Sequence, residues 1–168
     1  MRQASIALIM SLLASSAFAQ TDASIAARAK TIERLQLAGM NAATLPLCEV
    51  AGYVIDLDGR DDYMREEAEL AMGDGFAEDQ AYSYFISGLK GQNTRDVSTL
   101  SRATQLARAG DKPGAASVVR PFVDQIVDRC DLLASRSETR RFFTLAPLNG
   151  AVARRTALKY YGVADKAK

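Results

Sequence analysis

The segment AASVVRPFVDQIVDRCDLLA, residues 115–134, predicts the fold class of this chain. Its apolar side chains recur every three or four positions, as on the buried face of an amphipathic helix. They are Val119, Phe122, Ile126, Cys130 and Leu133. Pro121 falls inside this pattern, so it either kinks the helix or marks its true start. We therefore expect a core helix here, with Cys130 on its buried face.

A second apolar stripe carries the other cysteine of the chain. Leu47, Cys48, Ala51, Val54 and Ile55 recur at helical spacing. Two cysteines that both face the core can meet, and an oxidising compartment lets them pair. A redox-active pair is the alternative, but the chain lacks the C-x-x-C spacing that lowers a thiol pKa. The sequence therefore predicts a structural disulfide between Cys48 and Cys130.

The rest of the chain is also predicted to be helical, in short segments separated by Gly, Pro and Asn. We expect these further helices at residues 22–37, 46–57, 61–72, 78–89, 94–109 and 150–163. In the helix at 94–109, the side chains expected to face inward are those of Val97, Leu100, Ala103 and Leu106. No segment alternates cleanly between apolar and polar residues, so no sheet is expected. The prediction is an all-α, single compact domain of about six to seven short helices, bundle-like or orthogonal.

The first residues have the three parts of a secretory signal. Arg2 precedes an apolar run over residues 6–13, and Ala17 and Ala19 form an A-x-A cleavage site before Gln20. We expect a signal peptide at 1–19, a single helical domain at 20–168, and a periplasmic or secreted bacterial protein. The run is shorter than the roughly 20 residues that cross a bilayer, so no stable membrane anchor is expected after cleavage.

The composition excludes several classes of active site. The chain of 168 residues has no histidine and no tryptophan, with 21 basic and 20 acidic residues. Without histidine, Ser–His and Cys–His hydrolases and histidine-held zinc or haem are excluded. We expect no cofactor and no enzymatic activity; an unrecognised hydrolase of an envelope polymer is the distant alternative. The near-neutral charge also offers no general attraction to nucleic acid or to an anionic membrane.

Acidic and basic residues are nevertheless segregated along the chain. Residues 56–79 hold ten acidic and two basic residues, whereas residues 136–168 hold eight basic and two acidic residues. The candidate acidic contact face is Asp58, Asp62, Glu66 and Glu69, and the candidate basic contact face is Arg140, Arg141, Arg154, Arg155 and Lys159. The two regions could pair within one molecule, between two copies, or with a foreign partner.

The acidic segment also resembles part of a calcium loop. If Asp56 is position one of an EF-hand, Asp58 is the third ligand and Glu67 the twelfth. Arg60 would occupy a ligand position, however, and the glycine of the sixth position is missing. Capping of a helix that begins near Asp61 is the simpler interpretation. No metal site is predicted, and Asp56, Asp58 and Glu67 are kept as candidates only.

Segregated charge without catalytic side chains favours a binding protein. We expect an exported, non-enzymatic helical protein that acts by protein–protein binding in the cell envelope, as an inhibitor or immunity protein, a chaperone or an assembly factor. Its partner would be another protein or a second copy of the chain. A small-ligand or Ca²⁺-binding protein that uses residues 56–67 is the alternative hypothesis.

Overall fold

The computed structural model of the protein describes the backbone of residues 4–164 and the side chains from Ser24 onward. The chain divides into two compact units, residues 1–34 and residues 35–168. Its elements are α1 (Ala4–Val50), β1 (Val54–Ile55), α2 (Leu57–Gly73), α3 (Glu78–Arg108), α4 (Lys112–Ser135), the 3-10 helix η1 (Arg140–Phe142), β2 (Phe143–Leu145) and α5 (Gly150–Tyr160). The proposed cleavage site at Ala19 and Gln20 lies outside the residues with described side chains, so the signal peptide stays a prediction.

The helical class is confirmed, but the helices are fewer and longer than predicted. Residues 4–164 form five α-helices, not six to seven. The helices expected at 78–89 and 94–109 are one helix, α3, which passes through Gly91. The helix expected at 22–37 continues in α1 past Gly39 and includes Pro46. A single glycine costs a helix only about 1 kcal/mol, which packing readily offsets.

The expectation that the chain has no sheet is wrong. β1 and β2 form a two-stranded antiparallel sheet in which Val54 pairs with Leu145. Each strand has three residues or fewer. Such strands are too short to show the apolar and polar alternation by which a strand is recognised in sequence. The segment that follows Ala51 is therefore extended, whereas a helix was expected to continue to residue 57.

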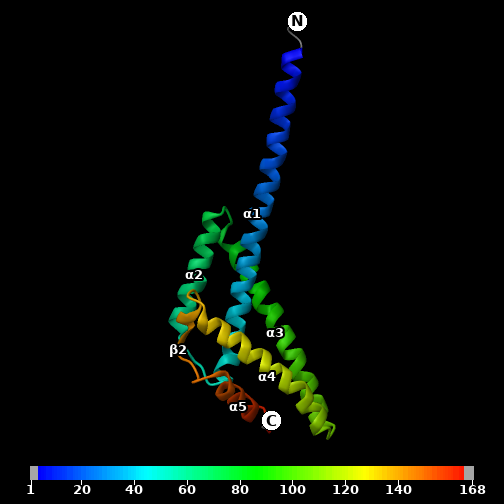
Figure 1. Cartoon of the computed structure of the whole chain (residues 1–168), viewed down its shortest axis with the longest axis vertical. Coiled ribbons are helices and arrows are strands. Elements are labelled where there is room, and N and C mark those ends of the chain that lie inside the picture. Colours follow the sequence, from blue (N-terminus) through cyan, green and yellow to red (C-terminus); the bar gives the residue numbers. More distant parts are fainter. Residues whose placement is uncertain (1–3, 165–168) are drawn as a thin grey trace. The chain divides into compact units, whose positions relative to one another are not determined.

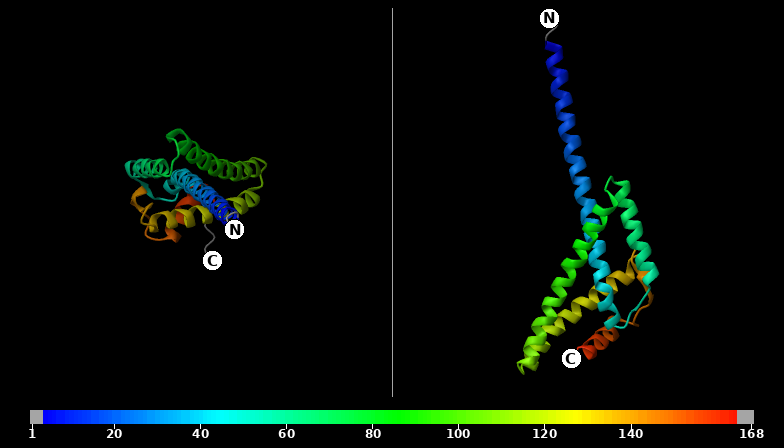
Figure 2. Two further views of the ribbon diagram at one scale, coloured as in Figure 1. Left: turned by 90° about the horizontal axis from the view of Figure 1, so that it is seen from above. Right: turned by 180° about the vertical axis from the view of Figure 1, so that it is seen from behind.

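Two clusters of buried side chains form the core of residues 35–164. The larger one lies around the two cysteines and includes Phe122, Val123 and Ile126 of α4 and Leu158 of α5. The smaller one is built around Phe142 of η1 and includes Tyr63, Phe85 and Leu133. The last part of α1, drawn in cyan, lies among α2, α3 and α4 (Figures 1 and 2).

Two glycines allow α1 and α3 to cross with their backbones in contact. A Cβ atom on Gly39 would lie 2.0 Å from the carbonyl oxygen of Phe85. A Cβ atom on Gly88 would lie 2.0 Å from the carbonyl oxygen of Gln36. Only glycine fits at both positions without moving a helix. These glycines therefore set how closely α3 lies against residues 35–50 of α1.

Candidate functional site

The segment considered for calcium binding is the start of α2. The carboxylate of Asp56 accepts a hydrogen bond from the backbone N–H of Gly59 at 3.0 Å, which makes Asp56 the N-cap of this helix. Every later position of the supposed loop, through Glu67, is helical. Among the described side chains, those of residues 24–164, no group of three His, Cys, Asp or Glu could hold a metal ion. The backbone is thus that of a capped helix, not of an EF-hand loop.

The four residues of the candidate acidic face all lie on α2 and are solvent-exposed. Asp62 accepts a hydrogen bond from Arg65 at 2.8 Å, and Glu69 lies 3.8 Å from the same guanidinium. Arg65 thus lies between two carboxylates that are two turns apart and relieves part of the repulsion along this face of α2. α2 holds six acidic residues and two arginines, so its outer surface keeps a net negative charge.

Glu66 is held by a basic residue from the other end of the chain. Arg141 of η1 donates two parallel hydrogen bonds to the Glu66 carboxylate, at 2.8 and 2.6 Å. Its guanidinium also lies 5.6 Å from the centre of the Tyr63 ring. The hydrogen bonds from Arg141 hold the pKa of Glu66 below its ordinary value. At this point the acidic and basic regions pair within one molecule.

The candidate basic residues do not share one element. Arg140 and Arg141 lie on η1, whereas Arg154, Arg155 and Lys159 lie on α5. Arg154 donates a hydrogen bond to Asp124 of α4 and is half-buried. Arg140, Arg155 and Lys159 are exposed and form no ion pair with any residue of the described part of the chain. Two of the five residues are thus already engaged by carboxylates of their own molecule.

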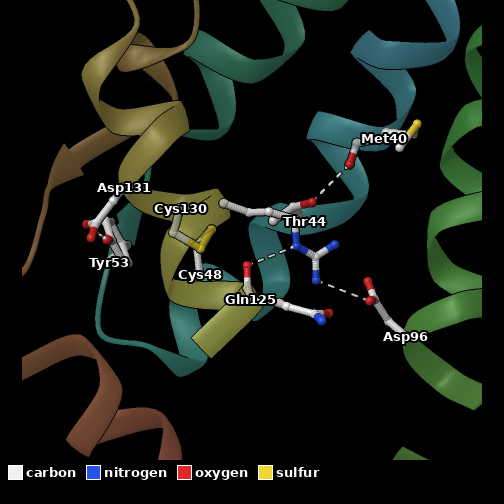
Figure 3. The surroundings of a disulfide bond; sticks show 9 residues. Met40, Thr44, Cys48, Tyr53, Asp96, Gln125, Cys130 and Asp131 are labelled. Carbon is white, nitrogen blue, oxygen red and sulfur yellow. Dashed lines mark hydrogen bonds and ion pairs between the residues drawn. A yellow bond between two sulfur atoms is a disulfide. The ribbon is translucent and has the colours of Figure 1, made fainter. Parts of the chain in front are cut away.

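The predicted disulfide is present and joins α1 to α4. The Cys48 and Cys130 sulfur atoms are 2.05 Å apart, and both residues are fully buried. Next to it, the hydroxyl of Tyr53 donates a hydrogen bond to Asp131, the residue after Cys130 (Figure 3). Burial raises the pKa of this hydroxyl far above its ordinary value, and the carboxylate of Asp131 adds to the effect. Both contacts tie the end of α1 and the chain that follows it to α4.

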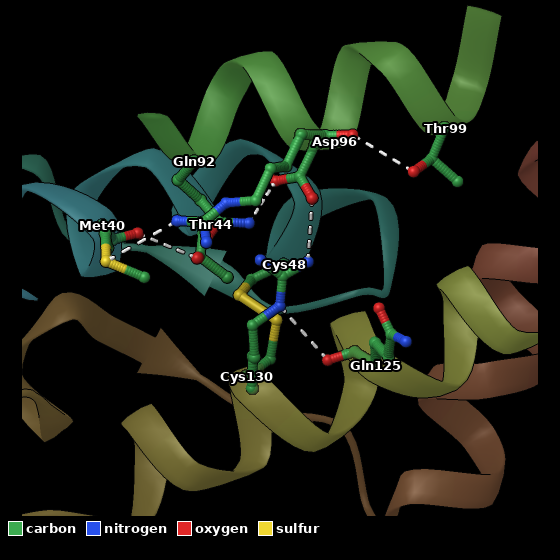
Figure 4. A network of polar contacts seen from close by, with 10 residues as sticks. Met40, Thr44, Cys48, Gln92, Asp96, Thr99, Gln125 and Cys130 are labelled. Atoms are coloured by element: carbon green, nitrogen blue, oxygen red, sulfur yellow. Dashed lines mark hydrogen bonds and ion pairs between the residues drawn. A yellow bond between two sulfur atoms is a disulfide. The ribbon is translucent and has the colours of Figure 1, made fainter. Parts of the chain in front are cut away.

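A buried polar network that the sequence did not reveal lies beside the disulfide. Asp96 of α3 is only 8% exposed; one of its oxygens accepts a hydrogen bond from Gln92 and the other from Arg129 of α4 (Figure 4). The neighbouring Val97, expected to face inward, is 64% exposed. The prediction is wrong for Val97 alone among these residues: Ala103 is buried and Leu100 packs against the larger core cluster, as expected. The charges of Asp96 and Arg129 balance, so the network joins two helices and leaves no free charged group.

A shallow groove at the end of α2 combines acidic and apolar residues. It is lined by Glu66, Glu69, Leu70, Gly73 and Asp74 and has a volume of about 570 Å³. Leu70 is 55% exposed within this acidic surround. The last turn of α2 carries no basic residue. Carboxylates at this end face the negative pole of the helix dipole, which is the unfavourable arrangement.

No helix within the described residues is both long and apolar enough to cross a membrane. The chain matches no protein-family model, no curated protein and no solved structure.

Proposed function

We propose that this protein is an exported, non-catalytic binding protein whose acidic α2 surface contacts a basic protein in the cell envelope. The contact surface is the groove at the end of α2, defined by Glu66, Glu69, Leu70 and Asp74. The observation that carries the proposal is the exposed Leu70 among carboxylates at the negative end of a helix dipole.

The chemistry of this surface favours a basic protein over other partners. Protein interfaces commonly place an apolar anchor at the centre and charged residues at the rim. Leu70 supplies the anchor, and Glu69 and Asp74 supply a rim of one sign. A Lys- or Arg-rich partner would add cations beside these carboxylates and offset their unfavourable interaction with the helix dipole. Such a contact is expected to weaken as the salt concentration rises.

The proposal is tested by capture of partners from an envelope extract of the source cell. The bait is the mature, oxidised protein, and the test variant is Glu69→Lys/Leu70→Ser. Its matched control is Glu49→Lys/Val97→Ser, which makes the same two changes at exposed positions on α1 and α3. We expect the test variant to lose a basic partner that the control retains, with the loss followed by quantitative mass spectrometry.

Two results would refute this role for α2. One is a partner that both variants retain equally; the other is a partner that both variants lose equally. Circular dichroism at 222 nm on each variant checks that the helical content is unchanged before capture is compared.

Export is a separate part of the proposal and has its own measurement. The apolar run at 6–13 and the Ala17-x-Ala19 motif support cleavage before Gln20. Intact-mass analysis of the protein from the envelope fraction is expected to give a chain that begins at Gln20. A full-length chain that stays in the cytosolic fraction would contradict export.

A further inference from the structure

A second groove, separate from the α2 surface, lies between the end of α3, the start of α4 and the chain that follows α5. Its volume is about 790 Å³, within the range of small-ligand sites. Ala103 and Val119, which belong to the larger core cluster, form its floor. Tyr161 and Val163 close one side. The groove is therefore a concave, mainly apolar surface with its floor on α3 and α4 and one side formed by the chain after α5.

The charged residues that line this groove are both cations. Lys112 and Arg120 are among the lining residues, and no Asp or Glu is. Arg120 donates a hydrogen bond to the backbone carbonyl of Ala164 at 2.6 Å, which orders its guanidinium without neutralising it. Neither cation forms an ion pair with a carboxylate of residues 24–164, the part of the chain with described side chains. The groove thus has a net positive charge beside an apolar surface.

Two of the three hydroxyl groups in the wall, those of Thr104 and Ser117, are already used, and the third belongs to Tyr161. Thr104 donates its hydroxyl hydrogen to the carbonyl of Leu100 at 2.8 Å, and Ser117 donates to the carbonyl of Gly114 at 2.7 Å. Neither is left to donate to a ligand. A peptide in this groove would bring a backbone N–H and C=O at each residue, and unpaired buried groups of this kind are unfavourable. An alkyl chain has no such groups.

We propose that this groove binds a fatty-acid anion, with its alkyl chain along the alanine-lined wall and its carboxylate at Lys112 and Arg120. Ala107, Ala115 and Ala116 give that wall small side chains, which leave room for an unbranched chain. A carboxylate can accept two hydrogen bonds from a guanidinium, and ionised partners make such bonds stronger than neutral ones. The ligand class follows from the combination of a mainly apolar groove and charge of one sign.

Calorimetric titration of the delipidated, oxidised mature protein with dodecanoate, below its micelle concentration, tests the proposal. We expect saturable binding of dodecanoate. Decanoate, shorter by two methylenes, should bind about tenfold more weakly, because each buried methylene contributes about a three- to fourfold change. Dodecyltrimethylammonium, which has the same chain length and a positive head, should also bind about tenfold more weakly or not at all.

Variants locate the binding in this groove. Lys112→Gln/Arg120→Gln should weaken dodecanoate binding about tenfold, and Lys90→Gln, an exposed cation elsewhere on α3, should leave it unchanged. Ala107→Glu should weaken it more than the nearly isosteric Ala107→Gln, because only the first adds a negative charge. A comparison at one position separates the effect of charge from that of volume.

Several results would overturn the proposal. They are the absence of saturable binding, equal affinity for the cationic amphiphile, and binding that Ala107→Glu does not alter. Sedimentation equilibrium adds a further one: a dimer that Ala107→Glu converts to a monomer would assign the groove to a second copy of the chain. None of these results depends on the α2 surface, so the two proposals fail independently.

Discussion

At the residue scale, two glycines of α3 that look alike in sequence have opposite surroundings. Gly88 lies at the crossing with α1, where an added Cβ would meet the backbone of Gln36. Gly91, one turn later, has nothing within 4 Å of an added Cβ. Both lie inside a continuous helix, where glycine is less favourable than alanine. The first is therefore required by packing, and the second only lowers helix stability.

Substitution of each glycine by alanine should change stability in opposite directions. Gly88→Ala is expected to lower the free energy of unfolding by about 1–3 kcal/mol, because the helices must separate to admit the methyl group. Gly91→Ala should raise it by about 0.5–1 kcal/mol, because alanine loses less backbone entropy in a helix. Urea unfolding followed by circular dichroism measures both values. Shifts of the same sign would contradict the crossing geometry.

At the scale of elements, the contact between η1 and α2 connects two regions of opposite charge. Arg141 and Glu66 are 75 positions apart in the chain, and both side chains are partly exposed. The pKa of Glu66 is lowered from 4.5, chiefly because its carboxylate accepts hydrogen bonds from Arg141. A lowered pKa in the folded state means that the ionised form is favoured there. The contact therefore stabilises the fold above pH 4.5 and loses its effect as the pH falls through the folded-state pKa.

The stability difference between the wild type and Glu66→Gln should therefore depend on pH. At pH 7 the variant should unfold at a lower urea concentration than the wild type, and the difference should shrink to nothing in acid. Arg141→Gln provides the control background, in which Glu66→Gln should have no further effect on the pH dependence. A difference that stays constant from pH 7 to the acid limit would show that the two side chains do not interact in solution.

At the scale of the whole molecule, the Cys48–Cys130 bond closes a long loop. The two residues are 82 positions apart, and the loop contains α2, α3 and most of α4. On the chain-entropy model, a cross-link over this length stabilises a fold by about 4–5 kcal/mol. This is a large share of the 5–15 kcal/mol typical of whole domains. The cross-link thus acts on the entire fold of residues 35–164.

Reduction should lower the stability of the whole fold in a single transition. We expect the protein with reduced cysteines to unfold in urea with a free energy lower by about 4–5 kcal/mol than the oxidised protein. Because both cysteines are fully buried, a reductant should act on the native protein only as fast as it unfolds. Thiol labelling after a timed exposure to reductant measures this rate. Rapid reduction without loss of the helical signal would contradict the buried position.

The helical class and the disulfide were both predictable from local patterns. The stripe from Val119 to Leu133 repeats at helical spacing, and such spacing needs no knowledge of the packing partner. Cys130 lies on this stripe, and Cys48 lies with Leu47 near the end of α1, although Val54 and Ile55 of its predicted stripe belong to β1. The segregation of charge was equally visible, because it requires only a count along the chain.

Three features depended on distant parts of the chain: the continuity of the helices, the burial of individual side chains, and the pairing of charges. Gly39 is a helix breaker by local preference, yet it stays helical because α3 packs against it at a distance no larger residue allows. Asp96 is buried where Arg129 of another helix pairs with its carboxylate, whereas the apolar Val97 beside it is exposed. Glu66 finds its partner, Arg141, across many intervening residues. These features arise from contacts between elements. The sequence pattern gives the local conformational preference of each residue, but it does not show which distant residues contact it in the fold.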